Sequence, residues 1–434
     1  MSNFPGSPQH PHPHPQLREC HGCGLLQTLP ALPRGMAAQC VRCSTVLHRT
    51  TIHGLGETTA LVVAALVLLV VTSTTTMMSV QTAGIQHSAY LLSGPSELVN
   101  RDMDLLAAVV VFVTLVAPFV RLAGLLYVLV RLRESTTRPH LVRLFALTER
   151  LRPWAMVEVF VFGVFVAYVK LNDLVTITLD PGVYALLALT FVMIWADTAI
   201  DREAIWDRIG GSGASGARAV TAHTHSIDVV GCELCGLVTP SRTGGRRCPR
   251  CASRLHHRKP DSLARTWALV IAAAVMYVPA NYFPVLTVMQ LGAGSPSTII
   301  GGVEELVTSR MYPLAALVFF ASIAVPMLKI MGLGIMLITV QAKGAAWLRD
   351  RTRLYHIIRG IGRWSMIDIF MESLLGALVR FGTVITIEPG IGAVAFCSVV
   401  ILTILAAETF DPRLMWDAAG EQVASRIEAA GASG

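Results

Sequence analysis

The sequence has too few charged residues for a soluble protein of its size. Only 15% of its 434 residues are Asp, Glu, Lys or Arg, whereas soluble domains usually carry about 25%. Apolar residues take their place, at 53% of the chain, and the mean hydropathy is +0.58. Such a composition requires either a lipid environment or a very large buried core.

The chain also lacks two signals that would indicate other functions. Its N-terminal stretch Gln9 to Pro15 alternates His and Pro without an apolar core, so we expect no cleavable signal peptide. We interpret residues 1–17 as a disordered Pro/His-rich tail, with weak metal collection as the alternative. No nucleotide-binding motif is present, so any energy coupling would use protons or gradients of lipid.

Long apolar runs favour the lipid environment. Several reach the roughly 20 residues that a helix needs to cross a bilayer, and the shorter ones have apolar flanks that can extend them. We predict eight spans: Thr59 to Val80, Leu105 to Val130, Met156 to Leu171, Tyr184 to Ala196, Trp267 to Met289, Leu314 to Val340, Met366 to Leu378 and Ile391 to Ala407.

The basic residues predict how these spans are oriented in the membrane. They fill the connections after the second and sixth spans, from Arg131 to Arg152 and from Lys343 to Arg363. The positive-inside rule then places both connections and both termini in the cytoplasm. A nucleic-acid patch is the alternative, but these arginines flank spans instead of clustering on one soluble face, so we expect no nucleic-acid partner.

The chain contains an internal repeat. Five short motifs recur at offsets of 208 to 212 residues. They are Cys20-His21-Gly22-Cys23-Gly24 with Cys232-Glu233-Leu234-Cys235-Gly236, Glu97-Leu98-Val99 with Glu305-Leu306-Val307, Pro118-Phe119-Val120-Arg121 with Pro326-Met327-Leu328-Lys329, Trp154-Ala155-Met156 with Trp364-Ser365-Met366, and Trp206-Asp207 with Trp416-Asp417. Repetition along the whole chain indicates two copies of one unit.

We therefore predict an all-α polytopic membrane protein of two tandem repeats, each with a small cytoplasmic four-cysteine zinc ribbon followed by four transmembrane helices. An even number of spans gives both copies the same orientation, as in parallel repeats. The expected segments are ribbon 1 (18–50), transmembrane domain 1 (55–209), a Gly/Ser-rich linker (210–229), ribbon 2 (230–258), transmembrane domain 2 (262–418) and a C-terminal tail (419–434).

Eight of the nine cysteines form four Cys-x-x-Cys pairs. Two such pairs a dozen or so residues apart can surround one tetrahedral ion with four thiolates, the pattern of structural zinc. We predict two zinc ions, one bound by Cys20, Cys23, Cys40 and Cys43, and the other by Cys232, Cys235, Cys248 and Cys251. Four thiolates leave no open coordination position, so we do not expect zinc catalysis or any enzyme activity.

A dithiol redox pair is the rival interpretation of these cysteines. It would need one reactive Cys-x-x-Cys at a helix start instead of four evenly arranged pairs. Disulfides are not expected on the cytoplasmic side. Cys397 lies inside an apolar span, where we expect it to serve packing.

Ionisable groups inside spans are costly, so each one marks a candidate functional site. In the second copy we predict that Lys329 faces Asp368, with Ser322 and Thr403 hydrogen-bonding nearby. A proton-responsive network in a transport pathway and a buried pair that fixes helix register are both compatible with this arrangement. The further candidates in spans are Glu372, Arg121, Glu158, Lys170 and Asp173.

A proline-rich segment adds a second feature to the second copy. Pro279, Asn281 and Pro284 interrupt span five, where free backbone carbonyls could line a cavity. The first copy has Thr72 to Thr76 at this place. We therefore expect the substrate cavity mainly in the second copy, with a simple cap of the helix end as the alternative.

Together these residues resemble the paraquat-inducible protein A family. The match rests on the Cys-x-x-Cys-Gly ribbons, the Arg-Pro-Trp-x-Met and Gly-Arg-Trp-Ser-Met motifs and Val278-Pro279-Ala280-Asn281, and it covers about residues 18–417. The resemblance implies a multi-pass protein of the bacterial inner membrane. It also implies a periplasmic tunnel partner with MCE domains and lipid as the transported molecule.

Three functions follow as hypotheses. The first is a lipid transport component that moves lipid between the inner membrane and the MCE tunnel. The second is a membrane scaffold that anchors the tunnel without transporting. The third is a membrane dithiol oxidoreductase.

Overall fold

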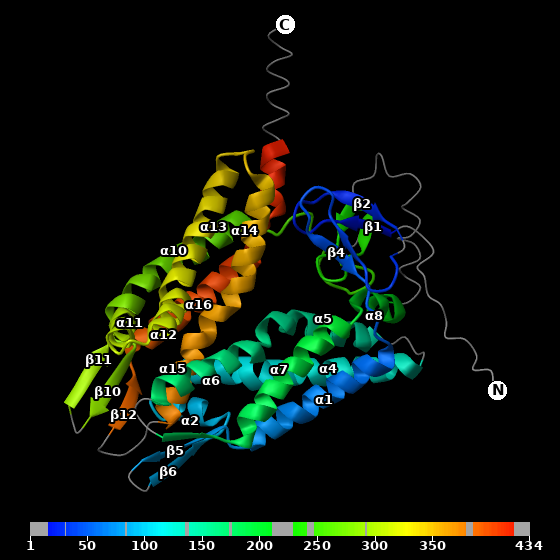
Figure 1. Ribbon diagram of the computed structural model, residues 1–434. Coiled ribbons are helices and arrows are strands. Elements are labelled where there is room, and N and C mark those ends of the chain that lie inside the picture. The colour runs from blue at the N-terminus through cyan, green and yellow to red at the C-terminus, as the bar shows by residue number, and fades with distance from the viewer. Residues whose placement is uncertain are drawn as a thin grey trace, which may run out of the picture.

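The computed structural model describes residues 16–30, 32–82, 85–134, 139–172, 176–210, 229–240, 247–290, 293–378 and 385–420. Helices predominate (Figure 1). Among the described residues, seven candidate spans are long and apolar enough to cross a membrane: Leu55–Thr74, Asp104–Arg131, Pro139–Val169, Pro181–Ala199, Ser262–Tyr282, Tyr312–Gln341 and Ile391–Thr409. They confirm a multi-pass membrane protein.

The eighth expected span is not established. Residues Met366 to Leu378 correspond to helix α15 (Ile367–Leu378), of which 12 residues are described against the roughly 20 needed for a crossing; residues 379–384 lie outside the description. In the first copy, α5 (Pro139–Leu151) continues through the 3-10 turn η3 (Arg152–Trp154) into α6 (Val157–Asn172), and the three together make one candidate span.

The two copies nevertheless have the same order of elements. The first half, residues 55–210, contains α1 (Leu55–Thr74), β5 (Met78–Thr82), β6 (Ile85–Ala89), α2 (Ser93–Val99), α3 (Asp104–Val111), η1 (Phe112–Val116), α4 (Ala117–Arg131), η2 (Leu132–Glu134), α5, η3, α6, β7 (Thr176–Leu179), α7 (Pro181–Ala199) and α8 (Arg202–Ile209). The second half, residues 262–420, contains α10 (Ser262–Tyr282), β10 (Leu286–Gln290), β11 (Ala293–Ser297), α11 (Ile299–Thr308), α12 (Tyr312–Phe319), η6 (Phe320–Ala324), α13 (Val325–Gln341), α14 (Leu348–Ile361), η7 (Gly362–Met366), α15, β12 (Ile385–Pro389) and α16 (Ile391–Thr409), followed by helical residues 413–420.

The fold is not all-α. Each half carries a three-stranded antiparallel sheet, with the order β6-β5-β7 in the first half and β11-β10-β12 in the second. The central strands β5 and β10 occupy residues that we expected to end spans one and five. Apolar and polar residues alternate in Met78 to Gln81, which is the period of a strand and not of a helix. Figure 1 shows both sheets at the end of the molecule opposite the first ribbon.

Span five ends within the proline-rich segment, but after Pro279 and not at it. Helix α10 continues through Pro279 to Tyr282, and the chain turns only afterwards. The carbonyl of Pro284 then accepts the N–H of Gly392 at 3.1 Å, just as Thr76 accepts the N–H of Gly182 at 2.9 Å in the first half. The proline-rich segment is therefore a helix end that meets the start of the last span, and both halves have this contact.

A widened helical turn is repeated in both halves. The π-helical turns η1 and η6 lie directly before Pro118 and Pro326. A proline has no N–H for the carbonyl four residues earlier, and its ring pushes that carbonyl away. The hydroxyls of Thr114 and Ser322 each donate to the carbonyl four residues before them, at 2.7 Å in both halves. Such turns are frequent at functional sites.

The halves meet through equivalent helices. Helix α6 packs on α15, and the equivalent residues Phe160 and Phe370 stack edge to face with ring centroids 5.4 Å apart. Gly163 allows this approach, because a Cβ there would lie 2.7 Å from the Cβ of Phe370. Contact between equivalent residues is what a local two-fold relation produces, and small residues let membrane helices approach closely.

Two small ribbons cap the end away from the sheets. Ribbon 1 consists of β1 (Gln16–Glu19), β2 (Leu26–Leu29), β3 (Ala37–Gln39) and β4 (Val46–Arg49), and ribbon 2 contains β8 (Val229–Gly231) and β9 (Val238–Pro240). The ribbons dock crosswise. Ribbon 1 packs near the tryptophan at the end of the second half, and ribbon 2 near the tryptophan at the end of the first half. The guanidinium of Arg42 lies 4.5 Å from the ring centroid of Trp416, while its equivalent Arg250 pairs with Asp207 beside the buried Trp206.

Strand β1 ties the two halves together through neighbouring charges of opposite sign. Arg18 pairs with Glu203 of the first half at 2.6 Å, and Glu19 pairs with Arg413 of the second half at 2.9 Å. Arg413 also bonds Asp411 at 3.0 Å, and its side chain is 3% exposed. Burial opposes the ionisation of Asp411, but the hydrogen bonds and charge of Arg413 outweigh it and hold the pKa of this carboxyl below its usual range.

Replacing this arginine should loosen the ribbon end. We expect Arg413→Met to lower the free energy of unfolding by about 3–5 kcal/mol, because it removes the ion-pair partner of the buried carboxylate of Asp411. The matched control is Arg353→Met, whose side chain is 59% exposed and whose ion pair should contribute at most about 1 kcal/mol. Thermal unfolding of both variants in detergent measures the difference, and equal unfolding temperatures would refute the role given to Arg413.

Candidate metal centres and buried polar sites

The eight paired cysteines form two buried clusters. In each cluster the four sulfur atoms lie within 4.8 Å of one another. Two Sγ–Sγ distances are 3.4 Å (Cys20–Cys43) and 3.6 Å (Cys23–Cys40) in ribbon 1, and two are 3.4 Å (Cys232–Cys251) and 3.5 Å (Cys235–Cys248) in ribbon 2. Four sulfurs bound tetrahedrally at about 2.3 Å would lie about 3.8 Å apart. Each cluster can therefore hold one metal ion, and no other such group occurs among the described residues.

The backbone around the cysteines repeats in all four turns. The N–H of each leading cysteine (Cys20, Cys40, Cys232, Cys248) donates to the carbonyl five residues later at 2.8–3.0 Å, and its carbonyl accepts the N–H of the residue four positions later at 2.8–2.9 Å. That fourth position has a positive φ, of +73° at Gly24 and +69° at Gly236. The left-handed conformation explains why glycine follows the first Cys-x-x-Cys pair of each copy.

A buried lysine forms the second candidate site. Lys329 lies in α13 with 2% of its surface exposed. Its ammonium donates to the hydroxyl of Thr403 at 3.0 Å and lies 3.4 Å from the carbonyl of Gly362. The predicted proximity of Lys329 and Thr403 is thus present. Ser322 lies seven residues earlier in the same candidate span, within the widened turn η6.

The expected carboxylate partner of Lys329 is not among the described side chains. The backbone of Asp368 and Glu372 belongs to α15 and that of Lys170 to α6, but their side chains lie outside the description, as does all of Asp173. The Lys329–Asp368 pair therefore remains a prediction.

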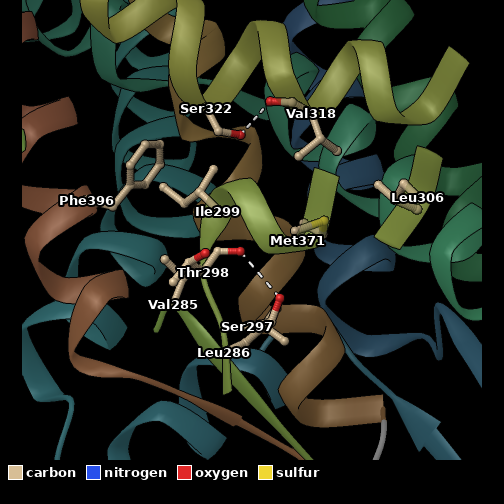
Figure 2. A pocket seen from close by; sticks show the side chains of 11 residues that line it. Val285, Leu286, Ser297, Thr298, Ile299, Leu306, Val318, Ser322, Met371 and Phe396 are labelled. Carbon is tan, nitrogen blue, oxygen red and sulfur yellow. Dashed lines mark hydrogen bonds between the residues drawn. The ribbon is translucent and has the colours of Figure 1, made fainter. Parts of the chain in front are cut away.

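A pocket lies next to Ser322 in the second half. Figure 2 shows Ser322 and Val318 of the widened helix facing Ser297 and Thr298 at the start of α11. Leu306, Met371 and Phe396 complete its mainly apolar wall. The room for water-sized molecules is about 40 Å³, enough for a few waters but not for a lipid chain. Asn281 does not line it; its side-chain amide donates to the carbonyl of Tyr277 at 2.8 Å.

A larger polar cavity of about 390 Å³ lies between the two halves. The first half contributes Arg121 and Glu158, which the sequence singled out, together with Asp197, the ion-pair partner of Arg121. The second half contributes Arg359 and Glu408, which form a two-pronged pair at 2.8 and 2.9 Å. Sequence reasoning missed the cavity, although Asp197 and Glu408 lie at corresponding places shortly before Trp206 and Trp416.

Comparison with known proteins agrees with the repeat. A family model described as "Paraquat-inducible protein A" matches residues 55–210 and again residues 263–420. The chain belongs to this family. Both matched segments lie directly after a thiol cluster, so the paraquat-inducible protein A unit is the repeat seen in the sequence.

Curated relatives span almost the whole chain. "Intermembrane transport protein PqiA" of Escherichia coli K12 is 33% identical over 416 residues, covering 92% of this chain and 95% of the relative. "Lipophilic envelope-spanning tunnel protein A" of the same strain is 29% identical, covering 94% and 92%. A "Probable intermembrane transport protein" of Haemophilus influenzae is 27% identical, covering 92% and 96%. No solved structure gives a significant match.

The two thiol clusters predict the metal content of the protein. We expect two metal equivalents per purified chain, and one equivalent in each of Cys40→Ser and Cys248→Ser, because three thiolates hold an ion much more weakly than four. Cys397→Ser is the control, since this cysteine is buried in α16 away from both clusters. Metal analysis by mass spectrometry tests this, and two equivalents in either ribbon variant would contradict the assignment.

Proposed function

We propose that the protein is the inner-membrane component of a lipid transport system that moves lipid between the inner membrane and an MCE-domain periplasmic tunnel protein. The observation that carries the proposal is the buried ammonium of Lys329, which lies on the same helix as a pocket-lining hydroxyl, Ser322. A charge in a membrane span is costly and is retained where it serves a pathway. The names of the relatives, which refer to intermembrane transport and to a lipophilic tunnel, support the same function.

The polar network would open and close the lipid path. The described partners of Lys329 are a hydroxyl and a carbonyl, so its charge would be balanced by Asp368 on the neighbouring α15. Protonation of that carboxylate would remove the balancing charge and loosen the packing of α13 against η7 and α16. The pocket beside Ser322 would then widen enough for an acyl chain. The absence of a nucleotide-binding motif makes a proton gradient the proposed energy source.

The proposed orientation places the ribbons and both termini in the cytoplasm, which requires an even number of crossings and therefore α15 as part of the eighth. The arginine-rich helices α5 and α14 lie toward the ribbon end, in accord with the positive-inside rule. The two sheets would then face the periplasm and meet the tunnel partner. We propose zinc as the metal of both ribbons, because four cysteine thiolates in a closed tetrahedral site are its usual structural ligands.

A scaffold that anchors the tunnel without transporting lipid is the second candidate. The small size of the pocket favours it, since no lipid chain fits in this conformation. In that case Lys329 would only hold helices together.

The substitution Lys329→Met separates the two candidates. We expect it to lower lipid transfer from proteoliposomes to the tunnel partner at least tenfold while protein yield and metal content stay normal. Lys343→Met is the matched control, because Lys343 is exposed beyond the end of α13. Normal transfer by Lys329→Met would overturn the transport role, and loss of folded protein instead of transfer would favour the scaffold.

A further inference from the structure

The cavity between the halves contains more charge than its ion pairs explain. Three guanidinium groups line it, those of Arg121, Arg152 and Arg359, and so do the carboxylates of Glu158, Asp197 and Glu408. Arg121 and Arg359 are each satisfied by a carboxylate of their own half. Arg152 differs, because among the described residues its ionic contact is Asp197 at 3.9 Å and it makes no hydrogen bond there.

The position of the cavity relates it to the membrane surface. Asp197 and Glu408 lie in the last turns of α7 and α16, at the ends of two candidate spans. His356, also in the wall, lies 3.3 Å from the hydroxyl of Thr45 in ribbon 1. The cavity is therefore at the ribbon end of the spans, where lipid headgroups would lie.

Its chemistry is that of a phosphate site. A guanidinium with unsatisfied donors binds a phosphate oxygen pair in a two-pronged geometry, and basic pockets between membrane helices bind lipid headgroups. The six ionised side chains described in its wall sum to zero charge, three positive and three negative. One added negative charge is tolerated better than two, which favours a phosphodiester over a phosphate monoester.

We propose that this cavity binds the phosphodiester headgroup of a phospholipid, with Arg152 as its principal ligand. The inference deepens the proposed function, since it places the headgroup of a lipid at the ribbon end while the pocket beside Ser322 lies near the sheets. The acyl chains would extend from the cavity along the interface of the halves.

Gly360 offers a way to block the site without removing a charge. It lines the cavity from α14, and a Cβ added there would meet no atom within 4 Å. Gly360→Leu should therefore fill the cavity while its helix gains stability from the loss of glycine.

The test measures ligand-induced shifts of the unfolding temperature of the full chain, purified in detergent and stripped of lipid. The probes are phosphatidylethanolamine, diacylglycerol with the same acyl chains, and inorganic phosphate. We expect protection by phosphatidylethanolamine alone, with an apparent affinity at least tenfold weaker in Arg152→Gln and in Gly360→Leu. Arg152→Lys should lie between these and the wild type, and Arg353→Gln, which alters an exposed arginine, should match the wild type.

Each other outcome overturns the proposal. Equal protection of wild type and Gly360→Leu would show that lipid does not occupy the cavity, even if Arg152→Gln fails to fold. Protection by inorganic phosphate as strong as by lipid would assign the site to free phosphate, and protection by diacylglycerol would show that acyl chains alone suffice. The assay needs no tunnel partner, so its result is independent of whether Lys329→Met stops transfer.

Discussion

The hydrocarbon core of a membrane offers no hydrogen-bond partner to a peptide group or a charge, and this constraint explains most of the structure. The hydroxyls of Ser73, Thr74 and Thr75 donate to the carbonyls of Val70 and Val71 near the end of α1. In the widened turns before Pro118 and Pro326, the hydroxyls of Thr114 and Ser322 likewise donate to backbone carbonyls, those of Val110 and Val318. The strands that follow α1 and α10 begin only after those helices have ended, and they pair within three-stranded sheets. A buried ammonium such as that of Lys329 is therefore an exception, and it is the feature for which function is the best explanation.

Both copies of the repeat unit satisfy their polar groups in the same way, but they differ in the charged residues that they place in the membrane. Three residues after the proline, the first copy has Arg121, whose charge is matched by Asp197 at the edge of the inter-half cavity. The second copy has Lys329 at this position, and its ammonium donates to the hydroxyl of Thr403 within the second half. The shared architecture is held at the middle by Phe160 on Phe370 and at the ribbon end by the neighbouring charges of β1. Divergence on a fixed scaffold allows one half to change its polar groups without losing the fold.

The features that could be predicted from the sequence are those with local causes. Spacing alone predicted the thiol clusters, because a Cys-x-x-Cys turn fixes its own geometry. Length and composition predicted most spans, and the cost of a charge in a span predicted that Lys329 and Thr403 approach each other. The sheets were missed, because β5 and β7 pair across about a hundred residues and their short strands continue apolar runs. The crosswise docking of the ribbons and the cavity at Arg152 depend on how the halves pack, and no local pattern encodes that packing.

The asymmetry between the halves is the central claim, and site-specific photocrosslinking tests it most directly. Leu306 lines the pocket of the second half, and Leu98 is its buried equivalent in the first half, 208 residues earlier. A photoreactive amino acid placed at either position, in cells that contain the tunnel partner, reports which one meets lipid during transport. The account predicts lipid adducts at position 306, few or none at 98, and loss of the 306 adducts in Lys329→Met. Equal labelling at both positions, or labelling at 98 alone, would contradict it.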